Sequence, residues 1–140
     1  MAATVRAQFR KMLHQATSEA DAEKADCEAF ETHCRRRFAS MIAAVESVSR
    51  EVEAQKIGIV SIEGAVRPER DLFQLVYGFT AEGWEKAWLI LTFENKTGMD
   101  QATVEYMSGR GRRMTETFNF SQMDRAIPYV LSLATAYFGS

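Results

Sequence analysis

The spacing of apolar residues changes its period near Lys56, and this change constrains the fold more than any other feature of the chain. Over residues 27–52 apolar side chains recur in steps of three or four. Over residues 73–79 and 89–93 they recur at every second position. The first pattern places side chains on one stripe of a helix, and the second places them on one face of a strand. We therefore predict an α+β protein, with helix first and antiparallel sheet second.

Length and composition indicate one soluble domain over residues 1–140, with a helical part (1–55) and a part holding the sheet and a C-terminal helix (56–140). The 140 residues are 46% hydrophobic, enough to bury a core. A net charge of −2 and a pI near 5.7 do not favour wholesale binding to nucleic acid or to anionic membrane. No apolar run reaches the ~18–20 residues that span a bilayer, and the first residues lack a signal-peptide core. We expect a cytoplasmic protein without a transmembrane segment.

The first 31 residues leave two helical arrangements open. Residues 3–16 form an amphipathic pattern, which suits a packed helix and also resembles a transit peptide or a surface-binding helix. Ser18 and Asp21 have the spacing of a capping box, so the helix either continues to about Ala54 or breaks at Thr17-Ser18 into a hairpin. Residues 1–18 carry three basic residues and no acid, whereas residues 19–31 carry six acids and one lysine. We expect these segments to pair, within one chain or between antiparallel partners.

Residues 27–54 give the strongest helical prediction. Cys27, Cys34, Met41 and Val48 recur every seven residues, as in a heptad seam. About 28 residues span ~42 Å, more than a sheet of ~5–6-residue strands covers. Part of this stripe is therefore expected to contact another helix, either the N-terminal one or a partner subunit. The interface candidates are Phe38, Met41, Val45, Val48 and Val52.

The rest of the chain predicts a five-stranded antiparallel meander followed by a helix. The expected strands are 57–66, 72–80, 86–95, 102–107 and 113–120. Apolar residues on both faces of the first strand indicate two-sided burial or a bulge near Ile59. Ser121 and Asp124 have capping-box spacing and open a last helix. Pro128 is tolerated if it lies in the first turn of this helix and otherwise kinks it. From Ala126 to Phe138 this helix is apolar nearly all round, so it needs cover on more than one side.

Residues that commonly carry chemistry show no catalytic or metal-binding spacing. Cys27 and Cys34 are ~10 Å apart along a helix, beyond the ~4.4–6.8 Å of a disulfide, so we expect both to be reduced, buried and inert. His14 and His33 lack carboxylate partners at helical spacing. We expect no metal, no cofactor and no catalytic residue, and an enzyme is the less favoured class. The strand acids are interpreted as solvent-facing: Glu63, Glu94, Glu105 and Glu116.

Three functions are consistent with these patterns. The first is a non-enzymatic homodimeric adaptor that binds an unknown protein partner, because two helices present more apolar surface than one chain is expected to cover. The second is a nucleic-acid or anionic-ligand binder that uses the arginine-rich hairpin, with Arg110, Arg112, Arg113, Tyr106 and Phe118 as candidates. The third is a small-molecule-binding protein or enzyme with a cavity between sheet and helix, lined by Tyr77, Trp88, Phe93, Tyr106 and Phe118.

Overall fold

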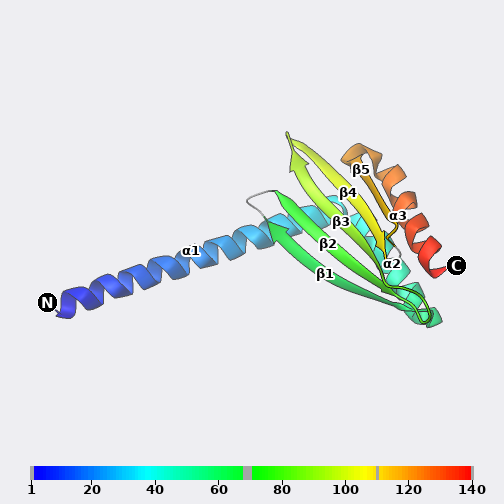
Figure 1. Cartoon of the computed structure of the whole chain (residues 1–140). Helices are drawn as coiled ribbons and strands as arrows, with labels where there is room; N and C mark the ends of the chain where they lie inside the picture. Colours follow the sequence, from blue (N-terminus) through cyan, green and yellow to red (C-terminus); the bar gives the residue numbers. More distant parts are fainter. Residues whose placement is uncertain (1, 68–70, 110, 140) are drawn as a thin grey trace.

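The α+β architecture is confirmed in the structure, a computed structural model that describes residues 2–67, 71–109 and 111–139. Two helices are followed by five strands, a short 3₁₀ helix and a final α-helix (Figure 1). In chain order the elements are α1 (Ala2–Arg37), α2 (Ala39–Gln55), β1 (Ile59–Arg67), β2 (Leu72–Thr80), β3 (Ala87–Lys96), β4 (Met99–Ser108), β5 (Arg113–Asn119), η2 (Phe120–Gln122) and α3 (Met123–Phe138). Among the described residues, no helix combines the length and the apolar character that crossing a bilayer requires.

Helix α1 runs unbroken through Thr17-Ser18, which excludes the helical hairpin; the other alternative, one helix unbroken to about Ala54, holds only as far as Arg37. The Thr17 hydroxyl donates a 2.9 Å hydrogen bond to the Leu13 carbonyl, one turn back in the same helix. Asp21 lies in the middle of α1, so no helix begins there. A capping box contributes only about 1 kcal/mol, which does not offset the backbone hydrogen bonds that a break would remove.

The helical region changes direction at Phe38 instead. Phe38 has φ −108° and ψ 27°, between the end of α1 and the start of α2. Its N–H still donates to the Cys34 carbonyl at 2.9 Å, and its carbonyl accepts from Ile42 at 3.1 Å. The Phe38 ring stacks on Phe93 with centroids 4.5 Å apart and meets Phe120 edge-on. The change of direction therefore occurs at a residue whose ring is buried in the core, where Phe38 is 2% exposed.

Lys56 ends α2 and accounts for the change of period. It adopts a left-handed conformation (φ 56°, ψ 34°), which a helix cannot continue. Its N–H donates to the Glu53 carbonyl, and that of Ile57 donates to Val52, both at 3.2 Å. These bonds satisfy carbonyls at the helix end and turn the chain into β1.

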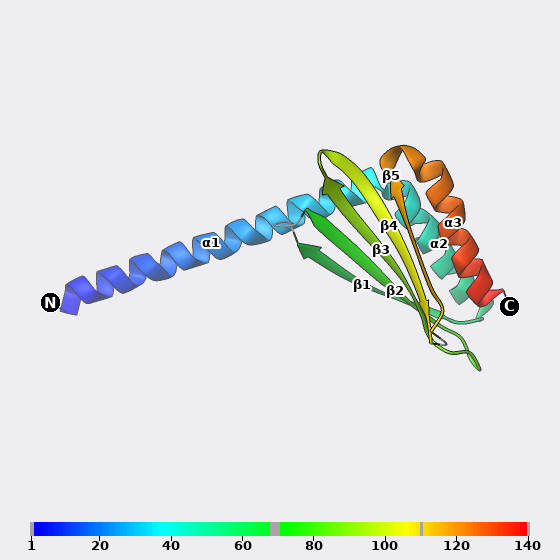
Figure 2. The same cartoon turned by 45° about the horizontal axis from the view of Figure 1, so that its top comes forward.

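The sheet is the predicted antiparallel meander, with strand order β1-β2-β3-β4-β5. One face carries Phe73, Leu75, Tyr77 and Phe79 from β2 together with their neighbours on β3 and β4, all buried. Helices α2 and α3 lie side by side over this face (Figure 2), and the last turns of α1 close one end of it. Within the described residues, no helix lies over the opposite face of the sheet (Figures 1 and 2).

Edge strand β1 differs from its prediction. Its register with β2 is continuous from Ile59 opposite Thr80 to Arg67 opposite Leu72, so there is no bulge. Ile59 and Ile62, on opposite faces, are 68% and 49% exposed, so there is no two-sided burial either. The apolar residues of β1 lie at an edge that one chain leaves partly uncovered.

The predicted capping box at Ser121 and Asp124 was wrong, because the 3₁₀ helix η2 begins at Phe120, and its N-cap is Asn119. Asn119 and Gln122 form the box: the Asn119 side chain accepts from the Gln122 backbone, and the Asn119 N–H donates to Gln122 Oε1 at 3.0 Å. Pro128 lies in the second turn of α3, not in the first. Helix α3 is covered on two sides within one chain, by the sheet and by α2. Its buried residues are Met123, Ala126, Val130, Leu133, Ala134 and Tyr137.

Candidate functional site

The N-terminal two thirds of α1 projects away from the rest of the molecule as an isolated helix (Figures 1 and 2). We call residues 2–26 the arm. Every side chain described between Val5 and Asp26 is exposed, and burial begins only at Cys27. Helix α1 has 36 residues, or ~54 Å of length. The arm is therefore a long helical surface that the described residues of the chain leave exposed from Val5 to Asp26.

The arm carries an apolar stripe that is bare. Val5, Phe9, Met12 and Leu13 are 64%, 65%, 69% and 57% exposed. The stripe is continuous with the face of α1 that packs on the sheet, where Cys34 is only 4% exposed. The steps of four and three along it join Phe9, Leu13, Ala16, Ala20, Glu23, Cys27, Phe30 and Cys34. One helix face thus serves the core at its C-terminal end and has no cover at its N-terminal end.

Charge is segregated along α1. The first 18 residues contain Arg6, Arg10 and Lys11 and no acid. Residues 19–31 contain six acids and Lys24, a net charge of 1 − 6 = −5. The basic and the acidic segment lie at different levels of one helix, so a partner with the opposite distribution of charge would complement both.

An open groove of about 850 Å³ lies where α1 passes the end of β1. Cys27 and Phe30 from the helix and Val66 from β1 give it an apolar floor, and all three are half-buried. Three carboxylates and one guanidinium complete the lining: Glu23, Asp26, Asp71 and Arg67. The groove therefore suits a ligand that combines apolar and basic side chains.

Asp100 anchors the base of α1 to the sheet. It accepts a 2.9 Å bond from Arg37 Nε and a 2.8 Å bond from Asn95 Nδ2, and His33 Nε2 lies 4.0 Å away. The Arg37 guanidinium also lies over the Phe120 ring, 3.6 Å from its centroid. These contacts hold α1, and with it the arm, at a fixed angle to the sheet.

Cys34 lies beside this anchor and lacks the properties of a nucleophile. Burial, followed by the nearby charges of Asp100 and Asp71, raises the pKa of its thiol to about 11. It is therefore a neutral thiol at physiological pH. Within the described part of the chain, no group of three or more His, Cys, Asp or Glu side chains is arranged to hold a metal ion. Cys34 and the neighbouring Asp100 therefore provide packing and anchoring contacts between α1 and the sheet.

The predicted interface residues lie inside the chain's own core. Phe38, Met41, Val45 and Val52 are 2%, 0%, 1% and 3% exposed, and Val48 is partly buried against them. Their contacts are with the sheet and with α3. The stripe that a partner could reach is its N-terminal continuation on the arm.

The structure separates the residues predicted to bind nucleic acid at the hairpin. Arg110 lies outside the described residues, and Arg113 is paired with Glu105 at 3.5 Å on the uncovered face. Tyr106 and Phe118 are 8% and 5% exposed on the covered face, so neither offers a free ring for stacking. Arg112 and Tyr106 do meet in a pocket of about 230 Å³, with Trp84 and Tyr137 also in its lining.

The residues predicted to line a cavity divide between the two faces of the sheet. Tyr77 and Phe93 are fully buried in the core, where Phe93 packs against Phe38 and Phe73. Trp88 pairs with Gly78 and Met107 on the opposite face, and Lys86 Nζ lies 5.5 Å from its ring centroid. Trp88 therefore cannot share a cavity with the other two.

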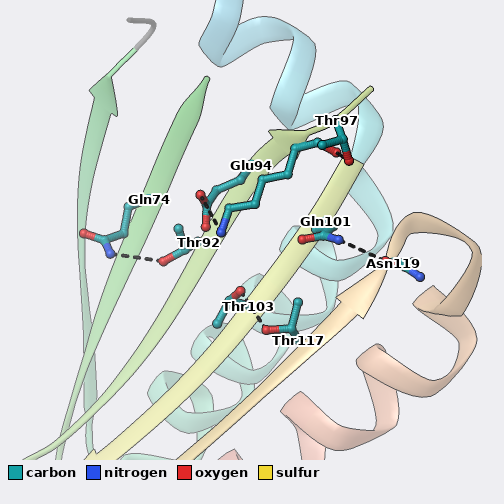
Figure 3. Close-up of polar contacts among 9 residues, drawn as sticks. Gln74, Thr92, Glu94, Thr97, Gln101, Thr103, Thr117 and Asn119 are labelled. Carbon is teal, nitrogen blue, oxygen red and sulfur yellow. Dashed lines mark hydrogen bonds and ion pairs between the residues drawn. The ribbon is translucent and has the colours of Figure 1, made fainter. Parts of the chain in front are cut away.

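The uncovered face of the sheet carries polar pairs that bond to one another (Figure 3). Gln74 donates to Thr92 at 3.1 Å, Thr103 and Thr117 are 3.1 Å apart, and Gln101 donates to Asn119 at 3.3 Å. Beside these pairs lies a half-buried apolar centre, with Val76 opposite Ile90 in the register. This face also carries carboxylates and basic groups that form ion pairs with each other, such as Glu94 with Lys96 and Glu105 with Arg113. Such a mixed face suits a protein surface better than a polyanion.

Sequence reasoning favoured an ordinary packed helix for the arm, left a transit peptide, a surface-binding helix and pairing between antiparallel partners open, and placed the interface candidates elsewhere. The signal was present, because the steps of four and three from Phe9 to Cys34 pass through Thr17-Ser18 without a change of phase. Comparison of the chain with protein-family models, curated proteins and solved structures finds no significant match.

Proposed function

We propose that this protein is a non-enzymatic adaptor module that works as a homodimer and uses the arm of α1 to self-associate. The observation that carries the proposal is the bare stripe, with Val5, Phe9, Met12 and Leu13 each more than half exposed. Four large apolar side chains on one helix face form a contiguous patch of the kind that marks interaction sites.

Without a partner, the arm is expected to be only marginally stable as a helix. Isolated helices are marginal in water because most helical stability in proteins comes from packing of an apolar face. The basic residues of the first half have no acid within their own segment. A second helix against the stripe would bury the apolar side chains and place acids near these bases.

The uncovered face of the sheet is the surface that supports an adaptor role. It lies away from α2 and α3, and a dimer formed through the arms leaves it free to contact other proteins. Its half-buried centre of Val76, Ile90 and Trp88 is surrounded by polar pairs, which matches the apolar core and polar rim of protein interfaces. Two copies of this face in one particle would allow bivalent binding.

The proposal is tested by placing charges on the stripe. We expect Phe9→Asp with Leu13→Asp to raise the dissociation constant of the dimer by roughly 100-fold or more, because burying an unpaired carboxylate costs several kcal/mol. The matched control is Gln8→Asp with Ser18→Asp, which adds the same charge away from the stripe and leaves association within a few-fold of the parent. Sedimentation velocity gives the association state, and near-ultraviolet circular dichroism reports whether the core is intact. A parent protein that sediments as a monomer, or a stripe variant that stays dimeric, contradicts the proposal.

A further inference from the structure

We infer that two copies of α1 pair antiparallel, centred near Ser18, so that each arm lies in the groove of the other copy. This inference rests on the proposed self-association through the arm. It adds the relative orientation of the two helices, their register and the groove in which each arm binds. The occupant of the groove is the segment of a second copy that runs from about residue 5 to residue 13.

The spacing of the stripe sets the register. Phe9, Ala16, Glu23 and Phe30 hold one position of a heptad, and Leu13, Ala20, Cys27 and Cys34 hold the other. In an antiparallel pair the two kinds of position face each other, so that facing residue numbers add up to 36. Phe9 then faces Cys27, Leu13 faces Glu23, and Ala16 faces Ala20. The alanines at the centre let the two helix backbones approach closely.

Charge selects the antiparallel orientation. Residues 1–18 carry a net charge of +3 and residues 19–31 carry −5. An antiparallel pair sets each basic segment against an acidic one, twice in the dimer. A parallel pair sets like charges together along the whole arm. Exposed pairs contribute only ~0–1 kcal/mol each, so the charges choose the orientation while the apolar stripe supplies most of the affinity.

The groove has the chemistry that the arm of a second copy requires. Its floor of Cys27, Phe30 and Val66 is apolar, and it lies level with Phe9 in the inferred register. Glu23, Asp26 and Asp71 provide three carboxylates along the groove, close to the level of Arg6 and Arg10 of the second copy. Glu23 occupies a seam position where an apolar residue is expected. In this register it lies near the basic segment of the second copy.

Cysteine cross-linking tests the register with a native reporter. In Phe9→Cys, the new thiol faces Cys27 of the second copy, so mild oxidation should give a disulfide-linked dimer whose linked peptides contain positions 9 and 27. The parent should not cross-link, because its Cys27 faces Phe9. The double variant Phe9→Cys/Cys27→Ala should lose the cross-link. Gln8→Cys is the matched control, since it is level with Cys27 but lies about 100° round the helix, and it should react at least 10-fold more slowly.

A second pair of variants keeps the test decisive if Phe9→Cys weakens the dimer. Ala16→Cys and Ala20→Cys, each in a Cys27→Ala background, should cross-link only when the two proteins are mixed. A parallel pair gives the opposite pattern, with the parent linked through Cys27 and each alanine variant linked to itself. A dimer in sedimentation that shows the parallel pattern, or no cross-link from either set, overturns the register and leaves the proposed function standing. Monomers throughout overturn both.

Discussion

At the scale of single residues, burial in this protein favours the neutral forms of a thiol and of several phenols. The pKa of Cys34 rises to about 11, first through burial and then through Asp100 and Asp71. The pKa of Tyr77 rises to about 12, again through burial and then through the charge of Glu46. Burial also raises the pKa of the tyrosines at 106, 129 and 137. Ionisation of these groups therefore favours the unfolded chain.

Stability is predicted to fall at alkaline pH in two overlapping steps. A folded-state pKa above the unfolded value stabilises the fold fully below the unfolded pKa, and this stability is lost as pH rises toward the folded value. For Cys34 the window runs from about 9 to about 11, and for Tyr77 from about 10 to about 12. Urea midpoints measured from pH 7 to 10.5 should be level up to about pH 9 and then decrease. Cys34→Ala should delay the decrease by about one pH unit, and an unchanged onset would contradict this assignment.

At the scale of elements, the strands were predictable and the helix boundaries were less so. The period of two placed β2 at its observed ends and predicted the meander, because a buried face fixes the alternation of side chains. The break in the helical region depends on Phe38, whose ring packs against Phe93 from a distant strand. The apolar stripe shifts by one heptad position at Phe38, a signal that is clear only once the core is known. Capping-box spacing at Ser18 and Ser121 was locally plausible, but tertiary packing decided both positions.

The observed capping box gives a direct stability prediction. Asn119→Ala removes the side chain that accepts from the Gln122 backbone and also from Gln101. The free energy of unfolding should fall by about 1 kcal/mol, within the usual ~0.5–2 kcal/mol for such caps. Ser121→Ala, at the position predicted from spacing alone, should change it by less than ~0.5 kcal/mol. Equal losses in the two variants, measured by urea denaturation, would mean that Asn119 does not act as the cap.

At the scale of the whole molecule, the chain consists of a packed α+β body and a helical arm. Sequence analysis placed the surplus apolar surface on the residues from Phe38 to Val52 and on the last helix, because it could not show that α2 and α3 lie together over the sheet. The body buries that surface. The apolar surface of the helices that stays exposed lies on the arm, at Val5, Phe9, Met12 and Leu13. Which half of a stripe is covered depends on where the sheet lies along the helix, and sequence periodicity does not carry that information.

Antiparallel arms give the dimer an extended form. With the pair centred near Ser18, the two Phe30 residues are ~36 Å apart along the helix axis. The two bodies then lie at opposite ends of the paired arms. In this arrangement, each copy presents its uncovered sheet face independently of the other.

The measurement that tests the account most directly is the molar mass of the unmodified protein in solution by light scattering, across micromolar concentrations. The account predicts twice the chain mass of 15.8 kDa, with dissociation on dilution if the affinity is modest. A mass of 15.8 kDa at every concentration would contradict self-association through the arm, and with it the proposed function.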